Sequence, residues 1–173
     1  MLRRVLHDRS AIIVTHDVLD ALLLADRVVV VDGGRVVEEG PTAQLLARPR
    51  SAFAARIAGL NMVRGRLEGH GVRDEHGLLV EGLVDQPVEQ GDPAVAVFRP
   101  SAVGVYRQPP GGSPRNVLDV TITELEPIGE QIRVRTEQLS ADVTPASVAE
   151  LDLAPGTEVV FAVKASEVTI YRS

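Results

Sequence analysis

The sequence contains no cysteine and no tryptophan, and only 3% of its residues are aromatic. Without cysteine, the chain can form neither disulfides nor thiolate metal sites. The scarcity of aromatic rings leaves little stacking surface for a single-stranded nucleic acid. No apolar run approaches the roughly 20 residues of a membrane span, and the N-terminus lacks a signal-peptide pattern. We therefore expect a cytoplasmic protein.

Basic residues are also in short supply. The net charge is −6, and Lys164 is the only lysine beside seventeen arginines. Residues 113–173 hold five basic and ten acidic side chains. Because such an acidic segment repels a phosphate backbone, we expect no nucleic-acid partner. The length of 173 residues allows one domain or two small ones.

Residues 1–59 alternate between short apolar runs and turn signals. The pattern predicts, in order, a buried strand at 11–14, a helix over about 18–25 capped by Asp17, a hairpin whose strands flank the turn at 32–35, and short helices over about 41–47 and 51–58. The strand at 28–31 is apolar on both faces, as in the central strands of α/β sheets.

Three segments in this region, at 13–17, 25–28 and 32–40, resemble the C-terminal end of an ABC-transporter nucleotide-binding domain. The resemblance places His16 on the family's switch histidine, which contacts the γ-phosphate of ATP. The sequence lacks the family's P-loop, its signature motif and the strand with the catalytic carboxylate. We therefore expect that this chain is no ATPase, that His16 is inactive in it, and that only a full-length protein binds ATP. A truncated α/β piece of ~60 residues is expected to be weakly stable or to pair with another chain.

Residues 60–112 show short alternating runs separated by turns, with a bend at Arg99-Pro100. The segment 98–103 resembles the Arg-Pro element of TOBE, the accessory β-domain of importer ATPases, so residues 60–112 are identified as its first part. His70 and His76 are six residues apart, which fits no recognised ligand spacing, and we expect no metal site.

Residues 113–173 predict five strands, at about 117–126, 132–135, 139–143, 158–164 and 168–171, with a break at 127–129. One helix is predicted to start at Thr144-Pro145, with Thr144 as its cap. Several short strands with one short helix fit a small OB-like barrel. The predicted fold is thus α+β: a partial α/β remnant in 1–59, followed by an all-β part in 60–112 and 113–173.

Two short stretches near the ends of this last segment each pair a cation with a hydroxyl two residues away: Ser113 with Arg115, and Lys164 with Ser166. In extended backbone, residues i and i+2 point to the same face. A guanidinium, an ammonium and two hydroxyl donors suit a small oxyanion, and a helix start at Thr144 would add unpaired N–H groups. The alternatives are a plain helix cap for Thr144, a surface ion pair for Arg115 and a solvated strand end for Lys164.

Residues 113–171 resemble the molybdate-binding Mop, or molbindin, module at the segments 113–116, 141–147 and 163–166. In that family these segments meet at subunit interfaces around a tetrahedral oxyanion. The resemblance implies as ligands Ser113, Arg115, Asn116, Thr144, Ser147, Lys164, Ala165 through its backbone, and Ser166. Asn116 belongs to the motif and either touches the ion or orders the loop. Pro114 stands where the family usually has alanine.

The resemblances together imply a truncated ATP-binding subunit of an ABC importer for molybdate or tungstate. Such a subunit forms a homodimer, binds a transmembrane permease and lies at the inner face of the cell membrane. Two rival functions stay open: a free molbindin-like oxyanion store, and a structural dimerisation domain of an importer for another solute. A DNA-binding regulator is disfavoured, because no helix-turn-helix candidate precedes the module.

Overall fold

A computed structural model describes residues 10–15 and 23–173 of the chain. The contacts divide the chain into two units, Met1–Gly59 and Leu60–Ser173, which we call unit 1 and unit 2. The predicted helix over 18–25, its cap Asp17 and the switch-histidine position His16 fall mainly on residues 16–22, outside the described part. Of the predicted helix, residues 23–25 are described: 23 and 24 are helical, and 25 is not.

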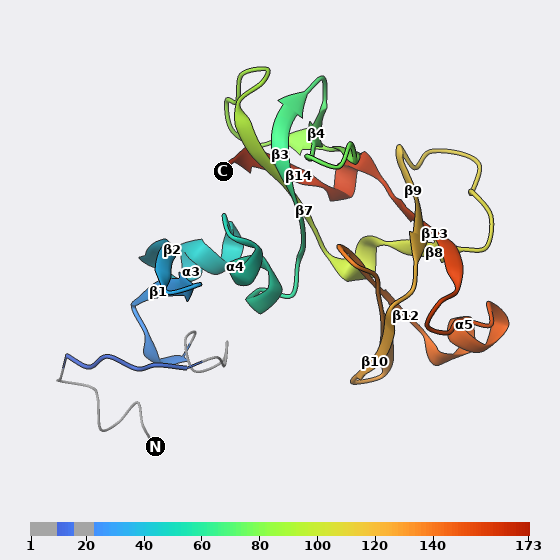
Figure 1. The fold of residues 1–173 in the computed structure, drawn as a ribbon, viewed down its shortest axis with the longest axis horizontal. Helices are drawn as coiled ribbons and strands as arrows, with labels where there is room; N and C mark the ends of the chain where they lie inside the picture. The colour runs from blue at the N-terminus through green and yellow to red at the C-terminus, as the bar shows by residue number, and fades with distance from the viewer. Residues whose placement is uncertain (1–9, 16–22) are drawn as a thin grey trace. The chain divides into compact units, whose positions relative to one another are not determined.

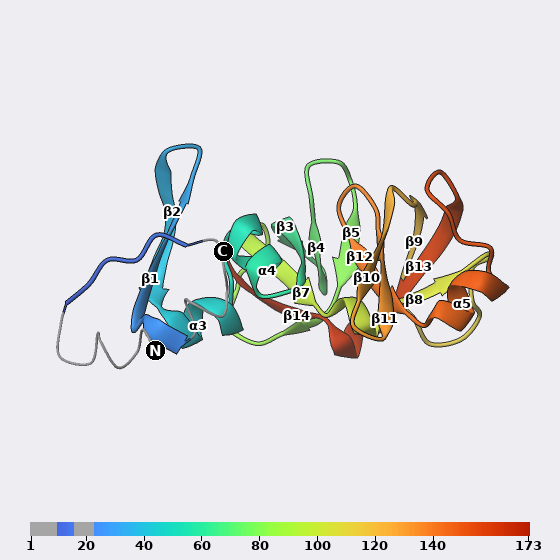
Figure 2. The same ribbon diagram turned by 90° about the horizontal axis from the view of Figure 1, so that it is seen from below.

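Unit 1 is built on the predicted hairpin. Strands β1 (Arg27–Asp32) and β2 (Arg35–Pro41) pair in antiparallel register, and the helices α3 (Thr42–Ala47) and α4 (Ala52–Ile57) follow. Figure 2 shows the hairpin edge-on. The glycines at 33 and 34 both have positive φ, which the turn requires and which glycine adopts without steric cost. These elements confirm the sequence prediction for residues 28–58.

The inner face of the hairpin packs on the two helices. Val30 is buried against Leu45 of α3 and Ala54 of α4. The Glu38 carboxylate of β2 accepts hydrogen bonds from the Ser51 N–H and hydroxyl at 3.0 and 2.9 Å. The same Ser51 hydroxyl oxygen accepts the Ala54 N–H, so it caps α4 as predicted.

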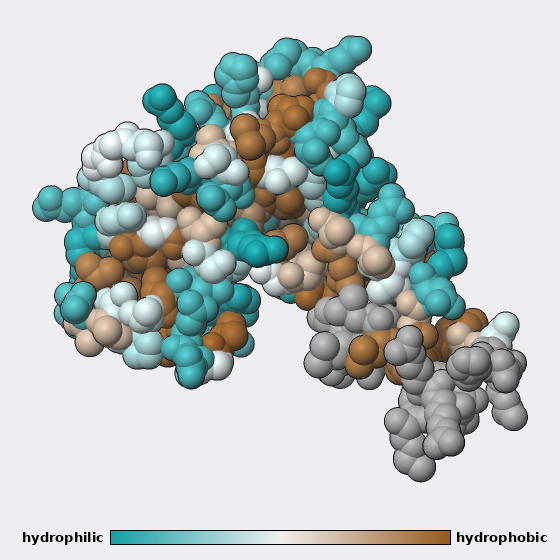
Figure 3. Space-filling model, turned by 180° about the vertical axis from the view of Figure 1, so that it is seen from behind, coloured by the Kyte–Doolittle hydropathy of each residue, from teal (hydrophilic) through white to brown (hydrophobic). Residues whose placement is uncertain are grey.

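The predicted strand at residues 11–14 is wrong. Residues 10–15 have no regular secondary structure, and Ile12 is 97% exposed. A strand needs a neighbour to take up its backbone hydrogen bonds, and among the described residues none pairs with this run. The outer face of the hairpin is similarly open, with exposed Val29, Val31, Val36 and Val37, and Figure 3 shows apolar surface on this unit.

Unit 2 consists of strands arranged in three sheets around one core (Figure 1). The six-stranded sheet has the order β5-β4-β3-β7-β14-β6, and the two three-stranded sheets have the orders β8-β13-β9 and β10-β11-β12. The strands are β3 (Asn61–Glu68), β4 (Gly71–Arg73), β5 (Leu79–Glu81), β6 (Leu83–Val84), β7 (Pro93–Phe98), β8 (Gly104–Tyr106), β9 (Asn116–Thr121), β10 (Glu124–Ile128), β11 (Gln131–Arg135), β12 (Ser140–Val143), β13 (Glu158–Val163) and β14 (Thr169–Arg172). One helix, α5 (Pro145–Glu150), and two 3-10 turns, η1 (Pro100–Ala102) and η2 (Ala165–Glu167), complete the unit.

Most of these strands occur where the sequence pattern predicts them, but one prediction is wrong. The segment 117–126 was expected to form one strand broken at 127–129. It instead forms two strands, and β10 continues through Pro127, which pairs with Ile132. Proline is tolerated there because β10 is an edge strand, so the missing N–H faces no neighbouring strand.

The residues 61–106 and 116–171 form two repeats with the same pairing register. Asn61 pairs with Phe98 at the start of the β3–β7 ladder, and Asn116 pairs with Val163 at the start of the β9–β13 ladder. Each ladder continues through six paired positions without a shift. We call the two segments the first and the second repeat.

The repeats exchange their last strands through the two 3-10 turns. After β7, η1 carries the chain to β8, which pairs with β13 of the second repeat. After β13, η2 carries the chain to β14, which pairs with β7 of the first repeat. The turns are alike: Arg99 and Lys164 precede them with φ, ψ of −78°, 142° and −72°, 140°. Each half of unit 2 is therefore completed by the other.

Candidate functional site

The two cationic stretches lie at the same end of one ladder. Because Asn116 pairs with Val163, the next residues outward are Arg115 and Lys164, on neighbouring chains of the sheet. Asn116 and Val163 are buried and face the core, whereas Arg115 and Lys164 are exposed and face away from it. Ser113 and Ser166 are also exposed. The structure thus brings Ser113, Arg115, Lys164 and Ser166 to one edge of unit 2, which we call the Arg115–Lys164 edge.

The two cationic side chains at this edge form no ion pair within the described part of the chain. Arg66, Arg73, Arg107, Arg133, Arg135 and Arg172 all bind carboxylates or carbonyl oxygens within unit 2. Among the described residues, the side chains of Arg115 and Lys164 have no hydrogen-bond or ion-pair partner. The surface ion pair considered for Arg115 is therefore absent from the described part of the chain, and two positive charges face solvent together.

The turn η2 adds backbone donors to this edge. The Glu167 and Val168 N–H groups bond to the carbonyls of Lys164 and Ala165 at 2.9 and 3.2 Å. A single 3-10 turn leaves its first N–H groups without a partner inside the turn. In η2 these belong to Ala165 and Ser166. The expected backbone role of Ala165 is thus compatible with its geometry.

The hydrogen-bonding groups of the Asn116 side chain are used within its own chain, which favours a structural role over direct contact with the ion. Its side chain is 2% exposed. The Nδ2 group donates to the carbonyls of Glu81 and Val163 at 2.9 and 3.3 Å, and Oδ1 accepts the Glu81 N–H at 2.7 Å. Both amide hydrogens are therefore used. Asn116 instead orders the strand end, the second of its two predicted roles.

Thr144 and Ser147 are placed elsewhere in the same chain. Thr144 caps α5, because its hydroxyl oxygen accepts the Ser147 N–H at 3.1 Å, and the two hydroxyls are 2.9 Å apart. The strand before them, β12, packs on η1 and β8, while β6 packs on η2. In Figures 1 and 2, α5 is well separated from the turn that precedes β14. One chain alone does not bring these hydroxyls to the Arg115–Lys164 edge.

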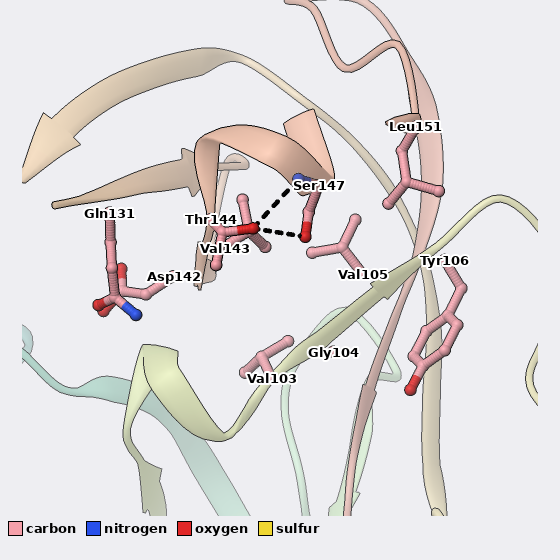
Figure 4. A pocket seen from close by; sticks show the side chains of 10 residues that line it. All are labelled: Val103, Gly104, Val105, Tyr106, Gln131, Asp142, Val143, Thr144, Ser147 and Leu151. Carbon is pink, nitrogen blue, oxygen red and sulfur yellow. Dashed lines mark hydrogen bonds between the residues drawn. The ribbon is translucent and has the colours of Figure 1, made fainter. Parts of the chain in front are cut away.

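A cavity of about 310 Å³ lies where β8 faces β12 and α5 (Figure 4). Thr144 and Ser147 are among its polar lining residues, and Asp142 is its charged one. A carboxylate in the wall disfavours an anion, even though Arg133 pairs with Asp142 at 2.7 Å. The lining residues are Val103, Gly104, Val105, Tyr106, Gln131, Asp142, Val143, Thr144, Ser147 and Leu151. Within one chain, this cavity therefore offers an oxyanion hydroxyl groups but no free cation.

Sequence reasoning missed two residues that shape the Arg115–Lys164 edge. Glu81 supplies the backbone N–H and C=O that hold Asn116. Asn61 makes the matching pair of bonds to Ser140 in the other half, at 2.8 Å each. A comparison of the sequence with itself would have found the repeat, because Ser101, Val103 and Tyr106 recur at the same spacing as Ser166, Val168 and Tyr171.

The second repeat belongs to a known class of β-domain, because the family model of the TOBE domain matches residues 112–170. The crystal structure of a cytoplasmic molybdate-binding protein, ModG with molybdate bound, aligns with a TM-score of 0.59 at 23% identity and covers 65% of this chain and 96% of that chain. This likeness supports the predicted OB-like β-fold.

The relatives of the whole chain are subunits of importers. It is 42% identical over 170 residues to the molybdenum import ATP-binding protein ModC of Mycobacterium tuberculosis, covering 94% of this chain and 46% of the relative. It is 27% identical over 167 residues to the molybdate/tungstate import ATP-binding protein WtpC of Pyrococcus horikoshii, covering 94% and 47%. The chain is homologous to the C-terminal part of molybdenum import ATP-binding proteins. It spans about half the length of these relatives.

Two negative observations apply to the described residues. They include no group of three or more His, Asp or Glu side chains placed to hold a metal ion. They also include no helix that is long and apolar enough to cross a membrane.

Proposed function

We propose that unit 2 binds molybdate or tungstate at the Arg115–Lys164 edge and thereby reports the oxyanion concentration to an ABC importer. The observation that carries this proposal is the pair of uncommitted cations, Arg115 and Lys164, at adjacent positions beside two exposed hydroxyls. Charge-assisted hydrogen bonds to an oxyanion are about twice as strong as neutral ones.

Completion of the site requires a second copy of the chain. Thr144 and Ser147 lie beside η1 and β8 instead of η2. In a homodimer, the hydroxyls of one copy approach the Arg115–Lys164 edge of the other, so that the ion contacts both. Dimerisation and anion binding are then coupled, because an ion that binds only the dimer stabilises the dimer relative to the separate chains.

The relatives support a wider proposal. The full-length subunit binds ATP, pairs with a transmembrane permease and works at the inner face of the cell membrane. This chain does not hydrolyse ATP by itself, since its sequence contains no Gly-x-x-x-x-Gly-Lys pattern followed by Ser or Thr. Residues 1–59 represent the end of the nucleotide-binding domain, and residues 60–112 and 113–173 the accessory domain that carries the oxyanion site.

Calorimetric titration with molybdate, tungstate and sulfate tests the proposal. We expect saturable heat with molybdate and tungstate, lost by at least tenfold in affinity in Lys164→Ala and Arg115→Ala. Arg64→Ala is the matched control, because Arg64 is exposed and without a partner among the described residues but lies in the middle of β3. No heat with any of the three anions would overturn the proposal and favour a structural dimerisation domain.

The size of the oligomer under native conditions distinguishes the storage function from the importer role. A dimer with bound molybdate supports the importer role. A larger closed ring with several anions per chain would favour a free oxyanion store.

A further inference from the structure

The Arg115–Lys164 edge coincides with the crossover that links the two halves of unit 2. Lys164 directly precedes η2, and Val168 directly follows it. The Val168 carbonyl accepts the Leu83 N–H of β6 at 2.8 Å, and β14 begins at the next residue. A displacement of η2 is thus transmitted within four residues to β14, the strand that pairs with the first repeat.

Elements of both repeats meet at this crossover. Asn116, at the start of β9, binds the backbone of Glu81 at the end of β5 and the carbonyl of Val163 at the end of β13. Gly82 is packed so closely on Val168 that an added Cβ would lie 2.7 Å from its Cγ1. The crossover has little room to shift while its hydrogen bonds remain intact.

On the side that faces β6, β14 is held by a short pairing. Its parallel pairing with β6 covers only two positions, Thr169 with Leu83 and Ile170 with Val84. Both Leu83 and Val84 are exposed. β6 is thus a short exposed edge strand, which separates at lower free energy than the core of a sheet, whereas β14 lies between β7 and β6 with Ile170 and Tyr171 buried.

We propose that an oxyanion at the Arg115–Lys164 edge fastens η2 and so fixes the exchanged strand β14 in the sheet of the first repeat. The inference rests on the proposed function of this edge and adds how occupancy is transmitted. Opening of β14 moves η2 and separates Lys164 and Ser166 from Arg115, so the ion must leave first. The other crossover, η1, carries β8 by the same backbone geometry.

Amide hydrogen exchange of the full 173-residue chain, with and without sodium molybdate, tests this transmission. At 100 times Kd, local opening that expels the ion is slowed roughly hundredfold. We expect this slowing at Ile170 of β14 and not at Val72 of β4, a buried residue outside both crossovers. The double variant Arg99→Ala, Ser101→Ala in η1 should leave the slowing at Ile170 intact, whereas Lys164→Ala should abolish it.

Calorimetry on the same samples separates the two proposals. Binding heat with the differential slowing supports the inference. Binding heat with equal slowing at Ile170 and Val72, or with none at either, overturns the inference and leaves the proposed function standing. Absence of binding heat removes both.

Discussion

Asn61 and Asn116 make the same pair of backbone hydrogen bonds, and each makes it across the boundary between the repeats. Asn61 of the first repeat binds the N–H and C=O of Ser140, and Asn116 of the second binds those of Glu81. Both side chains are buried. The two amides therefore tie each repeat to the other at the points where the long ladders begin.

Replacement of Asn116 by alanine should lower the free energy of unfolding by about 1–3 kcal/mol, because it leaves the part-buried backbone N–H and C=O of Glu81 without this partner. Asn61→Ala is the matched variant and should cost a similar amount. Urea denaturation followed by circular dichroism measures both. An Asn116→Ala protein of unchanged stability that no longer binds molybdate would restore the direct-ligand role.

The ion pair between Arg133 and Asp142 should be the most important one in unit 2. Its two hydrogen bonds are 2.7 and 2.9 Å long, and the side chains are only 17% and 11% exposed. The hydrogen bond to Asp142 raises the pKa of Arg133 above its ordinary value, so the guanidinium stays charged. Asp142→Ala should cost on the order of 2 kcal/mol, less than for a fully buried pair.

The more exposed pair of Arg135 with Glu126 provides the control for this prediction. Glu126→Ala should cost less than about 1 kcal/mol. Equal losses in the two variants, measured by urea denaturation, would show that burial does not distinguish the pairs.

Gly65 lies where β3 passes close to the chain after β4. An added Cβ would lie 1.8 Å from the Arg73 carbonyl oxygen, which is backbone and cannot rotate away. Gly65→Ala should therefore cost about 3 kcal/mol or more. Gly111→Ala, with no atom within 4 Å of the new Cβ, should change stability by less than about 0.5 kcal/mol. Thermal melting of the two variants checks the difference.

Acid should remove one stabilising contact of the first repeat. The hydrogen bond from Arg73 lowers the pKa of Glu68. Because the folded pKa is below the unfolded one, the contribution is complete above the ordinary glutamate pKa of about 4.3 and is lost as the pH falls through the lowered value. The stability difference between wild type and Glu68→Gln should shrink over that window and should also shrink in high salt. A difference that is constant down to pH 2 would contradict this.

The hairpin of unit 1 should open more easily than the sheets of unit 2. Its two strands have one packed face, and the valines of the other face are exposed. Amide exchange at Val30 should be much faster than at Ala96 of β7. Equal, global-type protection of both amides in a monomer would refute this.

Local sequence patterns predicted where the helices and strands of this chain lie better than they predicted which elements pair with one another. Val28–Val31 with its turn, and Thr144-Pro145 with its helix, were predictable because turn and cap chemistry act within a few residues. The run at 11–14 has strand composition, but its conformation depends on neighbours that composition does not supply. The continuation of β10 through Pro127 depends on its edge position, which only the assembled sheet decides.

The candidate site, too, was predictable from local spacing only in part. The pairing of each cation with a hydroxyl followed from spacing, and the structure places Arg115 beside Lys164 as one ladder end. The position of Thr144 did not follow, because the strand exchange moves it to the other crossover. The role of Asn116 depends on Glu81, a residue with no motif of its own.

The strand exchange also has a consequence for biosynthesis. β7 borders β14, which follows it far along the sequence, so the six-stranded sheet cannot close until β14 has left the ribosome. Until then the backbone groups on one edge of β7 are unpaired. Neighbouring nascent chains on one messenger RNA expose these edges to each other. Translation speed and chaperone capture should therefore determine the yield of this protein more than its final stability does.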